Sequence, residues 1–160
     1  MLDDTTWGFM RPAQRINAGV IYQNYCDDVL VLPSRHHWFM TLPGGEVAVG
    51  DRPLLAAQRA VEAQLGLVLE DTAAQALDLR LAKRSEQRPE VLVYLYHGGV
   101  LTDEALRGVT RVRYDWAPPN ALLSYMEKPD AVAVAETLRL GGDGPAALLR
   151  NGEPLAVATA

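Results

Sequence analysis

The stretch from residue 42 to 67, LPGGEVAVGDRPLLAAQRAVEAQLGL, has the residue types of a loop and helix that handle a phosphate group. A double glycine opens a loop, Asp51 is a suitable N-cap, and Gly66 is a suitable helix stop. A helix that holds a diphosphate through a metal ion needs acidic side chains, because hard cations take oxygen ligands. The helix predicted from Leu54 to Leu65 contains one acid, Glu62.

A helical wheel separates this helix into a small face and an apolar stripe. The stripe consists of Leu54, Val61 and Leu65, which predicts packing into the core. The small face consists of Ala56, Ala57, Ala60, Ala63 and Gln64. The simplest interpretation is that the small face lets another segment pack closely against the helix.

The spacing of the stretch nonetheless resembles the signature of the Nudix superfamily. That signature is Gly, five residues, Glu, seven residues, Arg-Glu, an aliphatic residue, any residue, Glu-Glu, any residue, Gly and an aliphatic residue. Asp51 stands in for the first Glu, and the residues that match in register are Gly45, Arg59, Val61, Gly66 and Leu67. The segments WFMTLPGG and Trp116-Ala117-Pro118 also resemble the family. The resemblance implies one Nudix-like α+β domain over residues 1–160, an α/β/α sandwich with a mixed central sheet.

The departures from the signature concern its metal ligands. The family's metal-binding glutamates are replaced by Ala60, Ala63 and Gln64. The resemblance implies Mg²⁺ or Mn²⁺ as cofactor, but alanine has no ligand atom and an amide offers one neutral oxygen. We therefore predict no confident metal site, with Glu46 and Asp51 as weak candidates. Arg59, which has lost its usual glutamate, is expected to pair with Asp51 or Glu62.

A subgroup of the superfamily is closer in one respect. The segment Ala63-Gln64-Leu65-Gly66-Leu67 resembles the end of the motif in GDP-mannose mannosyl hydrolases, which cleave a sugar C–O bond and need fewer metals. Those enzymes keep a Glu where this chain has Gln64, so their chemistry is not implied.

Other side chains near the predicted cleft could carry chemistry. We take Glu46 and His97 as candidate acid–base residues. Candidate ligand-binding residues are Gly44, Gly45, Arg59, Gln64, His36, His37 and Tyr96. A basic group around a loop, which could receive phosphate, comprises Arg80, Lys83, Arg84 and Arg88.

The remaining elements follow from periodicity and turn signals. Residues 1–14 are expected to form an N-terminal arm. Strands are predicted at Arg15–Tyr22, Asp28–Leu32, Trp38–Leu42, Leu77–Ala82, Glu90–Tyr96 and Thr110–Trp116. A second helix is predicted from Ala131 to Leu140, capped by Asp130, and Asn151-Gly152 predicts a tight hairpin.

Composition limits the function classes. The formal net charge is −5, which argues against a general nucleic-acid binder. The single cysteine, Cys26, excludes an internal disulfide and is typical of a reducing compartment. Because the sequence shows neither a signal-peptide pattern nor an apolar run of membrane-spanning length, we expect a cytoplasmic protein. The expected partner is a phosphate-containing small molecule, with a possible homodimer.

Three functions fit these observations. The first is a non-catalytic binder of a nucleotide-like or diphosphate-linked molecule on a Nudix scaffold. The second is a divergent hydrolase of a nucleoside diphosphate derivative or nucleotide sugar. The third is a repurposed, metal-independent biosynthetic enzyme that uses His and Glu as acid and base.

Overall fold

The structure is a computed structural model that describes residues 15–35, 37–81, 90–108, 112–141 and 144–155. The predicted arm, His36 and most of the basic group around Arg84 lie outside these residues. The described helices are α2 (Pro53–Leu65), α3 (Asp103–Arg107) and α4 (Lys128–Leu140), with a 3-10 helix η1 at Pro119–Ser124. The strands are β1 (Arg15–Gln23), β2 (Val29–Pro33), β3 (Met40–Thr41), β4 (Gly44–Glu46), β5 (Ala76–Arg80), β6 (Val91–Val100), β7 (Asp115–Ala117), β8 (Ala147–Arg150) and β9 (Glu153–Pro154).

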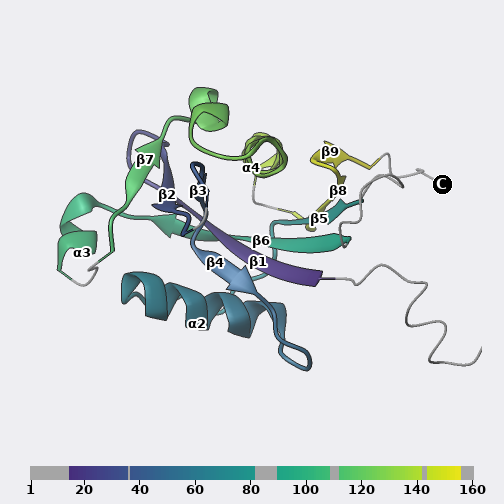
Figure 1. Cartoon of the computed structure of the whole chain (residues 1–160), viewed down its shortest axis with the longest axis horizontal. Coiled ribbons are helices and arrows are strands. Elements are labelled where there is room, and N and C mark those ends of the chain that lie inside the picture. Colours follow the sequence, from purple (N-terminus) through teal and green to yellow (C-terminus); the bar gives the residue numbers. More distant parts are fainter. Residues whose placement is uncertain (1–14, 36, 82–89, 109–111, 142–143, 156–160) are drawn as a thin grey trace, which may run out of the picture.

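The strands form one mixed sheet in the order β3-β2-β1-β6-β5-β8-β9, with β4 paired to β1 and β7 to β2. The central pair β1–β6 is parallel, whereas β1–β2 and β5–β6 are antiparallel. Helix α2 lies on one face of the sheet, and α4 lies on the other (Figure 1). The expected α/β/α sandwich with a mixed central sheet is therefore confirmed.

Side-chain alternation along β1 divides the core between the two faces. Ala18, Val20 and Tyr22 pack in the cluster that contains Val61 of α2. Ile21 points the other way, into the cluster that α4 completes. Each helix therefore covers its own apolar layer.

Neither long helix is capped by the acidic residue that the sequence predicted. The N-cap of α2 is Arg52, not Asp51, and α4 begins at Lys128 after Glu127 instead of at a cap by Asp130. Each helix has a proline in its first turn, and its fixed φ starts the helix at that point. The predicted helix ends are confirmed, because Gly66 and Gly141 both have positive φ.

Two predicted strands are shorter than expected. The segment Trp38–Leu42 contributes only β3. Of the predicted strand Thr110–Trp116, the first two residues lie outside the described ranges, and among the others only Asp115 and Trp116 lie in β7. Helix α3 was not predicted, although Thr102 caps it by accepting a hydrogen bond from the Ala105 amide at 3.1 Å. Helices this short are weak signals in a single sequence, because few residues carry the periodicity.

The predicted tight hairpin is confirmed and is joined to the sheet by a buried carboxylate. Asn151 and Gly152 have φ of 50° and 80°, as a type I′ turn requires. Asp78 of β5 is fully buried and accepts hydrogen bonds from the Gly152 amide and Arg80 Nε, both at 2.9 Å. Arg80 also bonds to Asp130, so this network ties β5 to the hairpin and to α4.

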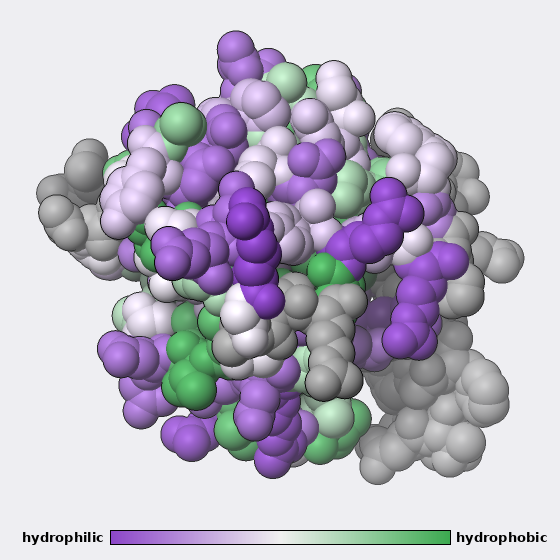
Figure 2. Space-filling view, turned by 90° about the vertical axis from the view of Figure 1, so that its left-hand side faces the viewer, coloured by the Kyte–Doolittle hydropathy of each residue, from purple (hydrophilic) through white to green (hydrophobic). Residues whose placement is uncertain are grey.

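The end of the molecule formed by α3 and the β1–β2 hairpin is mainly hydrophilic, with small separate apolar patches between the polar groups (Figure 2). Within the described ranges, no helix is both long and apolar enough to cross a membrane.

Candidate functional site

The double glycine has two different structural roles. Gly44 has a φ of 145°, and a Cβ at this position would lie 2.0 Å from the Ala18 carbonyl oxygen of β1. A Cβ at Gly45 would meet no atom within 4 Å. Gly44 is therefore required for the close approach of β4 to β1, whereas Gly45 faces open space.

The amide of Gln64 closes on the backbone of Gly44 at two points. Its Oε1 accepts a hydrogen bond from the Gly44 amide at 3.0 Å, and its Nε2 donates to the Gly44 carbonyl oxygen at 2.9 Å. Both ends of the side chain are thus engaged within the protein. Gln64 acts here as a clamp between α2 and β4, and any ligand contact would have to compete with these bonds.

The residues on this side of α2 do not fit the metal ion of the Nudix family. The side chains of Ala60 and Ala63 have no atom that could ligate a metal ion. The amide nitrogen of Gln64 donates a hydrogen bond to the carbonyl oxygen of Gly44. In the described part of the chain, no group of three or more His, Cys, Asp or Glu side chains could hold a metal ion. We call the surface of Ala60, Ala63 and Gln64 the α2 flank.

Arg59 pairs with Asp51, as one of the two predicted alternatives stated. Arg59 Nη1 lies 3.4 Å from Asp51 Oδ2, and the two side chains are 64% and 33% exposed. Asp51 is therefore engaged with a cation and is poorly placed to ligate a metal. The guanidinium remains accessible to solvent beside the α2 flank, where an anion could reach it.

The two candidate acid–base residues are not brought together. Glu46 is exposed in β4 and pairs with Asn17 of β1, whereas His97 lies in β6 and pairs with Ile21. These two positions of β1 are four residues apart, roughly 13 Å along the strand. β4 and β6 also pair with opposite edges of β1, so Glu46 and His97 cannot share one proton-transfer site.

His97 and Tyr96 face opposite sides of the sheet. Tyr96 is 4% exposed and packs in the core beneath α2, so it does not join His97 in a common cleft. His97 Nδ1 accepts a hydrogen bond from the Gly99 amide at 3.1 Å, and its Nε2 lies 3.0 Å from Gln23 Oε1. Because Nδ1 is an acceptor, the proton is on Nε2 and donates to Gln23. Burial lowers the pKa of His97, so the ring is held neutral.

His37 lies in the loop before β3, two strands away from β1 across the sheet. Its ring is exposed and stacks on Phe39 at a centroid distance of 4.6 Å. Trp38 beside it is 79% exposed, which differs from the buried side chain that a strand at this position would give.

One polar cluster was missed by the sequence reasoning. Asp103 Oδ1 accepts hydrogen bonds from Trp116 Nε1 at 2.8 Å and from the Tyr114 hydroxyl at 2.9 Å. These two bonds hold the pKa of Asp103 below its ordinary value. The Trp-Ala-Pro segment pointed to Trp116, but a partner thirteen residues away leaves no local signal.

Comparisons with known proteins find solved structures with a similar fold and low sequence identity. No model of a known protein family matches the chain, and no curated protein sequence does. A NUDIX hydrolase from Nitrosomonas europaea has a TM-score of 0.61 at 14% identity, over 92% of this chain and 97% of that chain. A MutT NUDIX hydrolase from Burkholderia pseudomallei has a TM-score of 0.58 at 16% identity, over 75% and 95%. An ADP-ribose pyrophosphatase from Streptococcus suis has a TM-score of 0.57 at 13% identity, over 85% and 98%.

These solved structures are too distant in sequence to transfer substrates or catalytic residues. They cover most of this chain, however, and at this sequence identity their similarity concerns the fold. The protein has the Nudix fold.

Proposed function

We propose that this protein binds a nucleotide-like or diphosphate-linked small molecule and does not catalyse metal-dependent diphosphate hydrolysis. The observation that carries the proposal is the bond of the Gln64 amide to both backbone groups of Gly44. With a glutamate at this position, a carboxylate oxygen would face the Gly44 carbonyl oxygen, and a cation between them would relieve the repulsion. In this protein the amide N–H of Gln64 donates to the Gly44 carbonyl oxygen instead, so α2 and β4 are joined here without a cation.

The neighbouring positions support the loss of hydrolysis. Metal-dependent phosphoryl chemistry needs charge stabilisation from cations held by several oxygen ligands. Ala60 and Ala63 supply none, and Asp51 is paired with Arg59. A residual Nudix-type hydrolysis would need metal ligands from outside the α2 flank.

The ligand class rests on fold analogy and on one exposed cation. The Nudix-fold neighbours include an ADP-ribose pyrophosphatase and a UDP-X diphosphatase, whose names indicate diphosphate-linked substrates. Gly45 leaves open space beside the α2 flank, and Arg59 presents a guanidinium next to it. A guanidinium binds phosphate oxygens through paired N–H groups, which suits a diphosphate held without metal.

The third function, metal-independent acid–base catalysis, has less support. Its candidates Glu46 and His97 lie on different strands and far apart, and both nitrogens of His97 already have partners. We therefore do not assign a general base.

Calorimetric titration of the full chain with ADP-ribose tests the proposal, first with a chelator and then with Mn²⁺. We expect saturable binding without metal and no release of AMP over time with it. Arg59→Gln should weaken binding by about fivefold to tenfold, the worth of one charge-assisted contact. Arg113→Gln, which removes an exposed arginine elsewhere, should not change affinity. Mn²⁺-dependent release of AMP would overturn the loss of hydrolysis, and an absence of binding would overturn the ligand class.

A further inference from the structure

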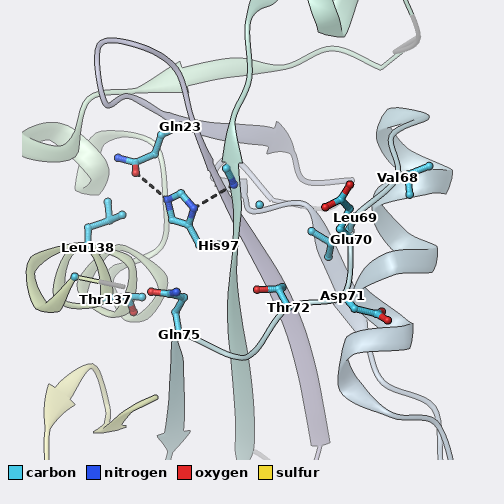
Figure 3. A pocket seen from close by; sticks show the side chains of 13 residues that line it. Gln23, Val68, Leu69, Glu70, Asp71, Thr72, Gln75, His97, Thr137 and Leu138 are labelled. Carbon is cyan, nitrogen blue, oxygen red and sulfur yellow. Dashed lines mark hydrogen bonds between the residues drawn. The ribbon is translucent and has the colours of Figure 1, made fainter. Parts of the chain in front are cut away.

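A polar cavity of about 750 Å³ lies on the other side of α2 from the α2 flank, between α4 and the segment that follows α2 (Figure 3). It exists because β5 pairs with β6 only as far as Leu95, so the last residues of β6 extend beyond the end of β5. Residues 68–75 run past this gap, and all of them except Ala73 and Ala74 line one wall. The volume is in the range of small-molecule sites. We propose that this cavity binds a small organic cation, such as a protonated amine or a guanidinium.

The floor of the cavity is a glycine bulge in β6. The β1–β6 register shifts between Ile21 and Tyr22, which leaves Gly98 as the extra residue. A Cβ at Gly98 would lie 2.1 Å from the Tyr22 ring, and Gly99 has a φ of 98°. Both positions therefore need glycine, and the bulge exposes backbone at the floor.

The bulge also fixes the polar group beside it. The Gly99 amide and Gln23 Oε1 hold the two nitrogens of His97, as described above. Figure 3 shows this ring, and the Thr72 hydroxyl, turned toward the space between α4 and the opposite wall. The floor is thus ordered and uncharged, and it does not supply a positive group to an anion.

The walls of the cavity are negative. Glu70 and Asp71 line it, and among the residues that the structure describes no lysine or arginine lines it. Asp71 accepts a hydrogen bond from Gln58 at 2.8 Å and turns toward α2, so Glu70 supplies most of the free charge (Figure 3). Both carboxylates still add to the negative potential of the wall.

The opposite wall is the C-terminal end of α4. This helix has 13 residues, and its last turn reaches the cavity through Thr137, Leu138 and the following Gly141. The last carbonyl groups of a helix have no partner within the helix and carry a partial negative charge. Arg139 in the same turn is paired with Glu136, so its charge is directed to that neighbour.

This combination selects the class of ligand. A phosphate or carboxylate would meet the Glu70 carboxylate and the partial negative charge at the end of α4, and the described lining residues include no basic side chain to offset them. A protonated amine can donate to those same oxygens, and Val68 and Leu138 provide apolar surface for its carbon chain. The inference goes beyond the proposed function, because it concerns a second site with the opposite charge preference.

Putrescine, 1,4-butanediol and succinate provide a matched set of probes, since they share a four-carbon chain and differ in charge. In calorimetric titrations of the full chain, putrescine should bind saturably, and the diol and the dianion at least about tenfold more weakly. Two-dimensional NMR should place the changes at the amides of Thr72 and Gly99, with none at Gly45. Equal affinity for the diol, changes confined to other surfaces, or no binding of putrescine would each overturn the proposal.

Glu70→Gln should weaken putrescine binding by about fivefold, because it removes one charge while keeping the side-chain volume. Glu104→Gln in α3 is the control, because it changes the net charge equally at an exposed position outside the cavity. Equal weakening by both variants would indicate general attraction to an acidic protein and would also overturn the site. ADP-ribose binding tests the α2 flank separately, so either proposal can fail alone.

Discussion

Polar groups differ in their surroundings on the two sides of α2. On the α2 flank, the amide of Gln64 binds both backbone groups of Gly44, so the flank offers no free ligand set to a metal. On the other side, the cavity at the glycine bulge is lined by Glu70 and by the C-terminal end of α4. The polar groups of Gln64 are thus paired within the protein, whereas those around the cavity border a space that could hold a ligand.

The largest expected effect comes from the network that holds α4, the wall of the cavity. Asp78→Ala leaves the buried Gly152 amide without an acceptor and removes one partner of Arg80. We expect the free energy of unfolding to fall by about 3 kcal/mol. Asp130→Ala, which removes only the more exposed partner of Arg80, should cost about 1 to 2 kcal/mol. Urea titrations of both variants measure this, and an equal loss would contradict the central role of Asp78.

A smaller loss is expected on the α2 flank. Gln64→Ala removes both bonds to Gly44 and should lower the free energy of unfolding by about 1 to 3 kcal/mol. Gln64→Glu should cost a similar amount at neutral pH, because two acceptors then face each other. Mn²⁺ should restore stability to this variant and not to the alanine variant.

Acid should also restore the stability of Gln64→Glu, since a protonated carboxyl can donate to the Gly44 carbonyl. The facing acceptor raises the pKa of the introduced carboxyl, so this stabilisation is present at low pH and lost as the pH rises through that pKa. Thermal unfolding from pH 4 to 7, with and without Mn²⁺, measures both effects. The two-point clamp would be disproved if Gln64→Glu behaved like wild type under all these conditions.

We expect His97, which lines the cavity, to make the free energy of unfolding depend on pH. Its pKa is lowered in the folded state by burial, so the unfolded chain binds the proton more readily. Stability should therefore be complete above the ordinary pKa of histidine, about 6.5, and decrease as the pH falls below it. His97→Gln should reduce this decrease in urea titrations, whereas His37→Gln in the exposed loop should leave it intact. An unchanged pH profile in His97→Gln would contradict the neutral, buried ring.

The smallest effect is expected for the exposed pair on the α2 side. Arg59→Ala breaks the contact with Asp51, and because both side chains are well exposed, the cost should be about 0 to 1 kcal/mol. The change should diminish further in high salt, where screening weakens the pair. A loss larger than that of Gln64→Ala would show that the arginine, and not the amide, holds the α2 flank together.

Much of the fold could be predicted from local signals. The box-like spacing from Gly45 to Leu67 predicted α2 and its glycine stop, and Asn151-Gly152 predicted the last hairpin. The helix starts were wrong because Asp51 and Asp130 were read as caps, whereas both carboxylates pair with arginines. A carboxylate that suits a cap also suits an ion pair, and only the packed structure distinguishes the two.

The candidate site was less accessible to sequence reasoning. The replacements Ala60, Ala63 and Gln64 were visible in the sequence, and so was the doubt they cast on metal binding. Tyr96 and His97 were grouped as neighbours, yet strand alternation places them on opposite faces of the sheet. The cavity went unnoticed because its described lining comes from four separate segments of the chain, around residues 23, 68–75, 97–99 and 137–141.

The sequence by itself determined that the α2 flank has no acidic side chain at Ala60, Ala63 or Gln64, and no conformation gives an alanine side chain a ligand atom. It also determined the elements of the Nudix fold, because periodicity, glycine stops and turn residues act within a few positions of each other. Only the tertiary structure decided that Gln64 binds Gly44, twenty residues away, and that His97 meets Gln23 across 74 residues. Such contacts depend on how strands and helices pack, and the same packing brings Glu70 and the end of α4 to one cavity.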